Sequence, residues 1–165
     1  MTDNTVSWRE QCLRDAIALS RGNVLTGGGP FGAVIARTDT GEVVAATGNR
    51  VTADNDPTAH AEVCAIRTAC ASLGTFTLVG YSLFSSCEPC PMCLGAVYWA
   101  RLDAVYFAAT RHDAAETGFD DAFLYTELVR PVGERTIPTV FVAELQSAAT
   151  ETFQHWLSAQ TRVAY

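Results

Sequence analysis

The sequence predicts an α/β domain in which helices cover both faces of a single sheet. Segments with the two-residue period of strands alternate with segments of helical period, in the order α-β-β-α-β-α-β-α-β-α. The chain has 165 residues, of which 48% are hydrophobic, and this suits one domain with a buried core. No repeat, linker or low-complexity stretch interrupts it. We therefore expect a single domain over residues 1–165.

Each element is predicted from the spacing of its apolar residues or from the residues that start and stop it. Helices are predicted over residues 8–22, 58–73, 91–100, 122–129 and 148–159, with a further helical stretch near 114. Strands are predicted over residues 31–36, 42–47, 81–86, 103–108 and 138–143.

Apolar spacing and helix-start residues predict the helices. Trp8, Cys12 and Ala16 recur at helical spacing in the first one. Asp56 and the proline after it are typical of a helix start, and apolar residues follow through position 73. Pro91 suits the first turn of the next helix, because its missing N–H is not needed there.

Apolar runs bounded by turn residues predict the strands. Residues 38–41 form the turn of a hairpin between the first two strands. The strands over 81–86 and 103–108 are each followed by helical residues, which is typical of a sheet covered by helices on both faces. The apolar run over 138–143 is predicted as the last strand.

Composition and charge narrow the class of protein. The net charge is −7 and every basic residue is an arginine, without a basic stripe, which argues against a nucleic-acid partner. No run of about 18 apolar residues is present, so we expect no membrane span. The N-terminus lacks the basic and apolar regions of a signal peptide. With six cysteines that mostly fall in buried-looking segments, a reducing, cytoplasmic location is expected.

Two short motifs supply the ligands of a metal. His60 is followed two residues later by Glu62, and the downstream segment 89–93 contains Cys90 and Cys93. One histidine and two cysteines give three protein ligands for a tetrahedral zinc and leave the fourth position to a catalytic water. Both motifs lie at predicted helix starts, where the partial positive charge favours thiolates. Glu62 is not needed as a ligand and is placed to move protons.

Three other interpretations of the cysteines compete. Cys87, Cys90 and Cys93 form a C-x-x-C-x-x-C run typical of iron–sulfur ligation, but that run expects a fourth cysteine where the chain has Val97. Cys90 and Cys93 alone resemble a redox pair, but a redox pair would not explain the His-x-Glu motif upstream of them. Cys87 is available as a fourth ligand of a structural zinc, in which case Glu62 has no role.

The chain resembles the cytidine deaminase superfamily and, within it, the bacterial guanine deaminases. His60-x-Glu62 with Pro89-Cys90-x-x-Cys93 carries the general resemblance, and this pattern is typical of zinc nucleobase deaminases. The closer resemblance extends over residues 29–35, 55–62, 86–96, 113–115, 118–121 and 134–138. The Gly-Phe-Asp-Asp segment over 118–121 and the terminal Tyr165 point to the guanine branch.

The resemblance implies a three-layer α/β/α fold around a mixed five-stranded sheet, one Zn²⁺ per chain and a homodimer. It also implies that the C-terminal segment is swapped between subunits and covers the partner's site. The activity implied is the hydrolysis of guanine to xanthine and ammonia in purine catabolism, with His60, Cys90 and Cys93 as zinc ligands and Glu62 as the catalytic proton carrier.

Four further residues are expected to bind the nucleobase. Asn49 offers an amide to the base edge, although asparagine is also a common turn residue. Asp121, preferred over its neighbour Asp120, would accept two hydrogen bonds from the guanine amidine edge, although either could instead cap a helix. Phe31 either stacks on the ring or packs in the core, and Tyr165 is either a lid over the neighbouring site or a frayed end.

Rival functions remain. Deamination of cytosine, cytidine or guanosine, or of adenosine in a transfer RNA, would use the same chemistry, although the last would favour a basic groove that the sequence lacks. A zinc-stabilised binding module without turnover belongs to another class, and it would have no use for Glu62. A screen of ammonia release over bases and nucleosides distinguishes these functions.

Overall fold

The computed structural model describes residues 6–164 of the chain. Contacts along the chain divide it into two compact units, Met1–Asp121 and Ala122–Tyr165. That residues 1–165 act as one domain stays a prediction. The elements of the first unit are α1 (Trp8–Leu25), β1 (Gly32–Arg37), β2 (Val43–Gly48), α2 (Val51–Asp54), α3 (Ala61–Leu73), β3 (Tyr81–Cys87), α4 (Pro91–Trp99), β4 (Ala104–Ala109) and α5 (Arg111–Ala115).

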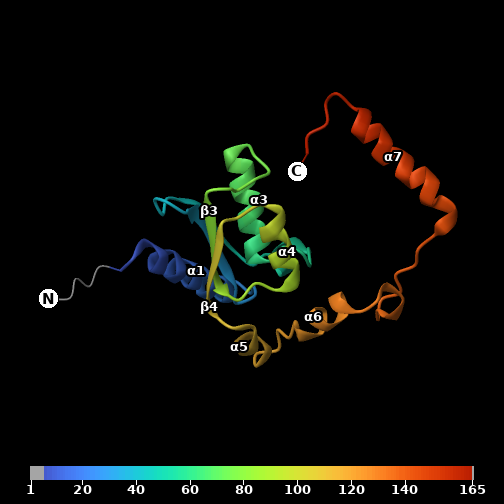
Figure 1. Ribbon diagram of the computed structural model, residues 1–165. Coiled ribbons are helices and arrows are strands. Elements are labelled where there is room, and N and C mark those ends of the chain that lie inside the picture. Colours follow the sequence, from blue (N-terminus) through green and yellow to red (C-terminus); the bar gives the residue numbers. More distant parts are fainter. Residues whose placement is uncertain (1–5, 165) are drawn as a thin grey trace. The chain divides into compact units, whose positions relative to one another are not determined.

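The sheet of the first unit is mixed and has the strand order β2-β1-β3-β4 in the described part of the chain (Figure 1). β1 pairs antiparallel with both β2 and β3, and β3 pairs parallel with β4. The N–H of Gly32 continues the β1–β3 ladder through a buried hydrogen bond to the hydroxyl of Ser86. Because β1 is antiparallel to both neighbours, its start lies beside the ends of β2 and β3. The starts of α3 and α4 lie at this same edge of the sheet.

Helices cover both faces of this sheet, as predicted. Ile35 and Leu83 belong to the core under α3 and α4, whereas Val34 and Phe84 belong to the core under α1. Adjacent residues of one strand point to opposite faces, so each strand supplies both cores in alternation. Figure 1 shows α1 on one side of the strands and α3 and α4 on the other. The three-layer α/β/α architecture is confirmed.

Close approach of main chains fixes α1 against the sheet. The Ser7 side chain accepts the N–H of Glu10 and so begins the helix at Trp8. At Gly32 a side chain has no room: a Cβ there would lie 2.2 Å from the carbonyl oxygen of Ala16. The helix therefore packs directly on the strand main chain.

Two predicted elements differ from the structure. The helix expected from position 58 begins at Ala61, because Asp56 accepts the N–H and the hydroxyl of Thr58 and closes a local turn instead of capping a helix. The predicted fifth strand over 138–143 is wrong: in the described residues the sheet has four strands, and 138–142 has no regular structure. An apolar run becomes a strand only where it finds a partner main chain, and this run belongs to the second unit.

The second unit contains α6 (Ala122–Val129), two short 3-10 turns, Val132–Glu134 and Ala143–Leu145, and α7 (Gln146–Ser158). Glu127 links its parts, since it pairs with Arg130 at 2.7 Å and accepts the N–H of Thr136 at 2.8 Å. None of the side chains over 122–164 is buried.

In the described part of the chain, the helices are too short or too polar to cross a membrane.

Candidate active site

The predicted zinc ligands lie at the starts of two helices. His60 is the residue before the first turn of α3, and Cys90 is the residue before the first turn of α4. Neither residue caps its helix through its side chain, so both side chains remain free to bind something else. Cys93 lies in the first turn of α4 and is fully buried. The positive ends of both helix dipoles therefore face the same small group.

The distances between these side chains fit a tetrahedral zinc. His60 Nδ1 lies 3.6 Å from Cys90 Sγ and 3.5 Å from Cys93 Sγ, and one ligand atom from each residue falls within 4.8 Å of the others. Zn–S bonds of about 2.3 Å and Zn–N bonds of about 2.0–2.1 Å at a tetrahedral angle separate nitrogen from sulfur by about 3.6 Å. The donor set and its spacing thus match three ligands of one zinc.

Protonation of the two thiols is strongly coupled. The Cys93 thiol donates a hydrogen bond to the sulfur of Cys90. This hydrogen bond and the one from His60 lower the pKa of Cys90 to about 4. The same hydrogen bond, followed by burial, raises the pKa of Cys93. The pKa of His60 is raised, first by its hydrogen bond to Cys90. At neutral pH the cluster carries a thiolate, which is the ligand form that a metal cation needs.

Glu62 lies inside the protein next to this cluster. It is 5% exposed and accepts a hydrogen bond of 3.4 Å from the Ser85 hydroxyl. Burial is the main reason that its pKa is raised above the ordinary value for a glutamate. A carboxyl group whose pKa is raised toward neutrality exchanges protons readily, which is the property of a general acid–base.

Asn49 and Phe31 lie together at the ends of β2 and β1. Asn49 is 7% exposed, and its Oδ1 accepts the N–H of Val51 at 3.2 Å. Both side chains border Gly29: a Cβ there would lie 3.3 Å from Asn49 and 3.5 Å from Phe31. Phe119 contacts Phe31 edge to face, with ring centroids 5.0 Å apart. An amide and an aromatic face thus lie side by side, as base binding requires.

Asp121 is the carboxylate of the 118–121 segment that faces the cluster. It is half-buried, whereas Asp120 is exposed. Burial is the main reason that the pKa of Asp121 is raised, and the negative charge of Cys90 raises it further. The charge of Asp121 in turn contributes to the raised pKa of His60.

The structure therefore places seven of the eight expected site residues. Five of them interact around the metal cluster, namely His60, Glu62, Cys90, Cys93 and Asp121. Asn49 and Phe31 lie together beside Gly29. Tyr165 lies outside the described residues.

Sequence reasoning missed three side chains of this region. Ser85 could have been found from the two-residue period of β3, because Leu83 faces α3 and Ser85 must then do the same. Phe119 lies inside the Gly-Phe-Asp-Asp segment, in which only the acidic residues carry a predicted role. Asn23, on α1, reaches the carbonyl of Asn49 across a sequence separation that no local pattern reveals.

The fold and the site define a class of protein. The family model of the cytidine and deoxycytidylate deaminase zinc-binding region matches residues 6–109. The chain belongs to this family. A His/Cys/Cys cluster with a buried glutamate beside it agrees with the zinc-binding region that the family model describes.

Within that class the chain is similar to particular proteins. It is 50% identical over 157 residues to the guanine deaminase of Bacillus subtilis (strain 168), over 94% of this chain and 98% of that protein. The X-ray structure of guanine deaminase from Bacillus subtilis matches it with a TM-score of 0.89 and 49% identity, over 94% of this chain and 98% of that chain.

Two more distant relatives match over shorter stretches. A mutant protein crystallised in complex with 8-azaguanine matches with a TM-score of 0.67 and 34% identity, over 70% of this chain and 66% of that one. The tRNA-specific adenosine deaminase of Agrobacterium fabrum is 43% identical over 91 residues, which is 54% of this chain and 59% of that protein.

Proposed function

We propose that this chain is a zinc-dependent aminohydrolase that converts guanine to xanthine and ammonia. The observation that carries the proposal is the similarity to Bacillus subtilis guanine deaminase over 94% of the chain. This similarity extends beyond residue 109, where the match to the zinc-binding region of the family ends. The tRNA-specific adenosine deaminases match over 54–68% of the chain.

His60, Cys90 and Cys93 would hold one zinc ion per chain. Zinc, when bound, polarises a water molecule so that it can act as a nucleophile at neutral pH. The helix N-termini at His60 and Cys90 stabilise the thiolates, and the close packing around Cys93 excludes bulk water from that side.

Glu62 moves both protons of the reaction. Its carboxylate accepts a proton from the attacking water and delivers it to the ring nitrogen beside the amino-bearing carbon. Once the oxygen–carbon bond has formed, Glu62 takes the second proton from that oxygen and gives it to the amine. The carbon–nitrogen bond then breaks, ammonia leaves and the carbon becomes a carbonyl. Burial suits Glu62 to this double role, because it raises the pKa of the group.

Three residues of the same chain would bind the base. The Oδ1 of Asn49 already accepts the N–H of Val51, so the NH₂ group of this side chain is the one that would donate to an acceptor on the base. Asp121 accepts from the ring N–H and amino group of the amidine edge, and the raised pKa of Asp121 is lowered again when those donors arrive. Phe31, supported on edge by Phe119, stacks on the ring.

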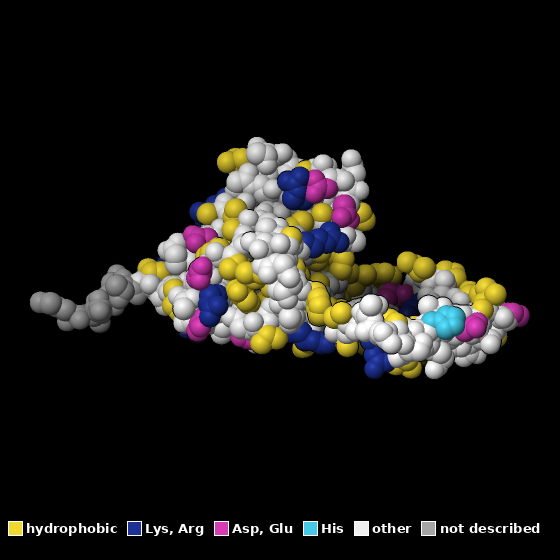
Figure 2. All heavy atoms as spheres, turned by 90° about the horizontal axis from the view of Figure 1, so that it is seen from above, with side chains coloured by type: hydrophobic (Ala, Val, Ile, Leu, Met, Phe, Trp, Pro, Cys, Tyr) yellow, Lys and Arg dark blue, Asp and Glu magenta, His cyan; other side chains and the backbone are white. Residues whose placement is uncertain are grey.

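A small substrate also agrees with the charge of the chain. The net charge is −7, and on the face drawn in Figure 2 the arginine side chains are scattered singly among hydrophobic and acidic ones. Tight binding of a phosphate backbone uses clustered positive charge. We therefore propose a free nucleobase as the partner, and neither a nucleic acid nor a membrane.

We further propose a homodimer in which residues 122–165 pack on the partner subunit and Tyr165 closes the partner's site. In the second unit, Phe141 is 69% exposed and Trp156 is 43% exposed, although both are large apolar side chains. Such side chains are stabilised by an apolar surface that the unit does not itself supply. A swapped segment is a low-cost route to a dimer.

The proposed setting is purine catabolism in the cytoplasm. All six cysteines are free thiols, which suits a reducing compartment.

An ammonia-release assay tests the proposed function. The purified protein is offered guanine, guanosine, cytosine, cytidine, adenosine and a tRNA anticodon stem-loop at equal concentration. We expect guanine to be the fastest substrate. Faster release from cytidine or the stem-loop would reject the guanine assignment while leaving the zinc chemistry intact, and no release from any of them would favour a binding module.

A further inference from the structure

We propose that Asn23 is a positioning residue for nucleobase binding, which holds Asn49 and the Gly29–Phe31 segment in the orientation that meets the base. The inference rests on the proposed function, because it assumes that Asn49 and Phe31 face the substrate. Asn23 itself lies near the end of α1 and would not touch the substrate.

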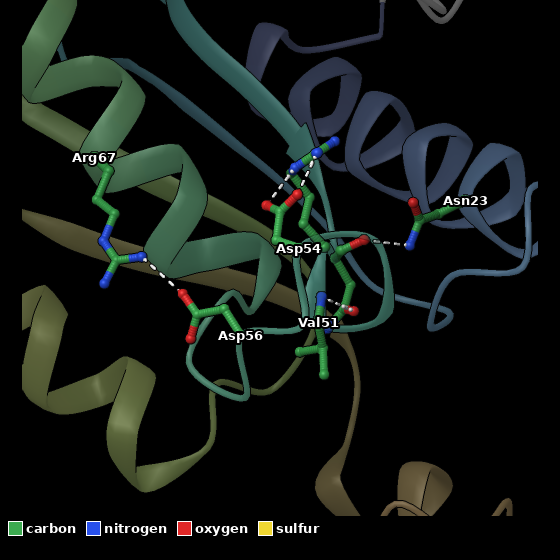
Figure 3. A network of polar contacts seen from close by, with 7 residues as sticks. Asn23, Val51, Asp54, Asp56 and Arg67 are labelled. Carbon is green, nitrogen blue, oxygen red and sulfur yellow. Dashed lines mark hydrogen bonds and ion pairs between the residues drawn. The ribbon is translucent and has the colours of Figure 1, made fainter.

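Both donor positions of the Asn23 amide are used. Its Nδ2 donates to the carbonyl oxygen of Gly29 at 2.7 Å and to that of Asn49 at 2.8 Å. Figure 3 shows the amide of Asn23 reaching from α1 toward the chain that precedes Val51. One side chain therefore joins the helix to the glycine-rich loop and to the end of β2.

The residues that Asn23 holds are themselves linked. The N–H of Asn49 donates to the carbonyl of Phe31 at 3.0 Å, and the N–H of Phe31 donates to the carbonyl of Gly29 at 2.8 Å. The Asn49 side chain is then oriented by the N–H of Val51. Asn23 thus completes a ring of hydrogen bonds whose members include both side chains proposed to contact the base.

Two glycines leave room for this side chain. A Cβ at Gly28 would lie 2.4 Å from Asn23 Nδ2, and a Cβ at Gly48 would lie 2.9 Å from Asn23 Oδ1. Gly28 also donates its N–H to the carbonyl of Asn23 at 2.9 Å. Segments from two different parts of the chain therefore close around the same amide.

The contacts require an amide rather than another group of the same shape. Aspartate is isosteric with asparagine, but its ionised carboxylate has no hydrogen to donate. In Asn23→Asp both carbonyl oxygens would face the single carboxylate oxygen that replaces Nδ2, so two attractive contacts would become repulsive without a change in volume. Asn23→Asp is therefore the variant that removes positioning with the least loss of packing.

Hydrogen exchange tests the positioning without any ligand. In Asn23→Asp we expect the amides of Asn49 and Val51 to exchange about tenfold faster or more, while the Ile35 amide in the core of the sheet keeps its rate. The control is Thr38→Val, which removes a side-chain hydrogen bond of 2.9 Å to Ser82 at the far end of the same sheet. Unchanged exchange at Asn49 and Val51, or the same pattern in Thr38→Val, would overturn the proposal.

Binding of 8-azaguanine, measured by calorimetry on zinc-loaded protein, tests the consequence for the site. We expect Asn23→Asp and Asn49→Ala each to weaken binding about 10- to 100-fold and the double variant to bind no more weakly than Asn49→Ala alone. Losses that multiply in the double variant would mean that Asn23 does not act through Asn49 and would reject the proposal. If the unaltered protein does not bind 8-azaguanine, the proposed function fails, and hydrogen exchange still decides the role of Asn23.

Discussion

His60 and Cys90 each occupy the position just before a helix, and the Nδ1 of one lies 3.6 Å from the Sγ of the other. The two residues are thirty positions apart in the sequence. Packing of α3 beside α4 is therefore what sets the distance between the two ligand atoms. A metal bound there would link two helix N-termini.

The first prediction is that purified protein contains one zinc per chain. Cys90→Ser and Cys93→Ser should each lose most of it on dialysis against a chelator, because a hydroxyl is a much poorer zinc ligand than a thiolate. Elemental analysis of the purified protein measures this. Iron with a visible charge-transfer band, or a variant that retains full zinc after dialysis, would contradict the assignment.

The second prediction is that Cys87→Ser keeps its zinc. Cys87 lies at the end of β3 and its Sγ is 3.5 Å from the carbonyl oxygen of Thr110, so this thiol is already engaged elsewhere. Burial raises the pKa of Cys87 to about 11, which also makes it slow to react with alkylating agents at neutral pH. Zinc content and the number of rapidly alkylated thiols provide the two measurements, with Cys90→Ser as the matched comparison.

The third prediction concerns Glu62→Gln. This variant keeps the shape of the side chain and its acceptor for the Ser85 hydroxyl, but it cannot carry a proton. Guanine turnover should fall by about 10²–10⁴-fold while the zinc content stays at one per chain. Turnover close to that of the unaltered protein, or loss of zinc, would show that Glu62 has another role.

The fourth prediction tests the C-terminal segment in trans. Tyr165→Ala chains should have low guanine turnover and Glu62→Ala chains almost none. Mixing them under conditions that permit subunit exchange should restore part of the activity, because one site of a mixed dimer then combines an intact Glu62 with the partner's intact Tyr165. Each variant mixed with itself is the control. No gain on mixing would mean that the tail acts within its own chain or not at all.

The fifth prediction is a pH dependence of stability. The Thr58 hydroxyl and N–H stabilise the ionised Asp56 and lower its pKa below 3.8, with a smaller contribution from Arg67 (Figure 3). A carboxyl whose pKa is lowered by folding contributes stability above its unfolded pKa and loses it as the pH falls through the folded value. The melting temperature of the protein should therefore exceed that of Asp56→Asn at pH 5–7, and the two should converge as the pH falls below 3.8. A constant difference down to low pH would contradict this origin.

Much of the site follows from sequence because its ligands lie on short, local motifs. The spacing of Cys90 and Cys93 and the two-residue offset of Glu62 from His60 already predict the chemistry, and the proline after Cys90 predicts the helix start. The predicted start of α3 at position 58 is wrong because the Asp56 carboxylate accepts a hydrogen bond from the Thr58 hydroxyl and closes a local turn. Local sequence alone does not distinguish such a turn from a helix cap.

What depends on long-range contact was not predictable in the same way. Asn23 meets Asn49 only because α1 packs beside β2, and Phe119 meets Phe31 only after the chain has passed through β4 and α5. The apolar run over 138–143 has the composition of a strand, but strand formation also requires a partner that composition does not reveal.

The contact between Gly32 and α1 limits how this site could be altered by selection. An added Cβ at position 32 would meet the main chain of Ala16, and no side-chain rotation can relieve such a collision. Randomising position 32 in a search for altered base preference would therefore yield mostly misfolded chains, even though it adjoins Phe31. Phe119 is 46% exposed and contacts Phe31 edge to face, so we expect it to tolerate replacement. New specificities would therefore be found more readily by substitution at position 119 than at position 32 in β1.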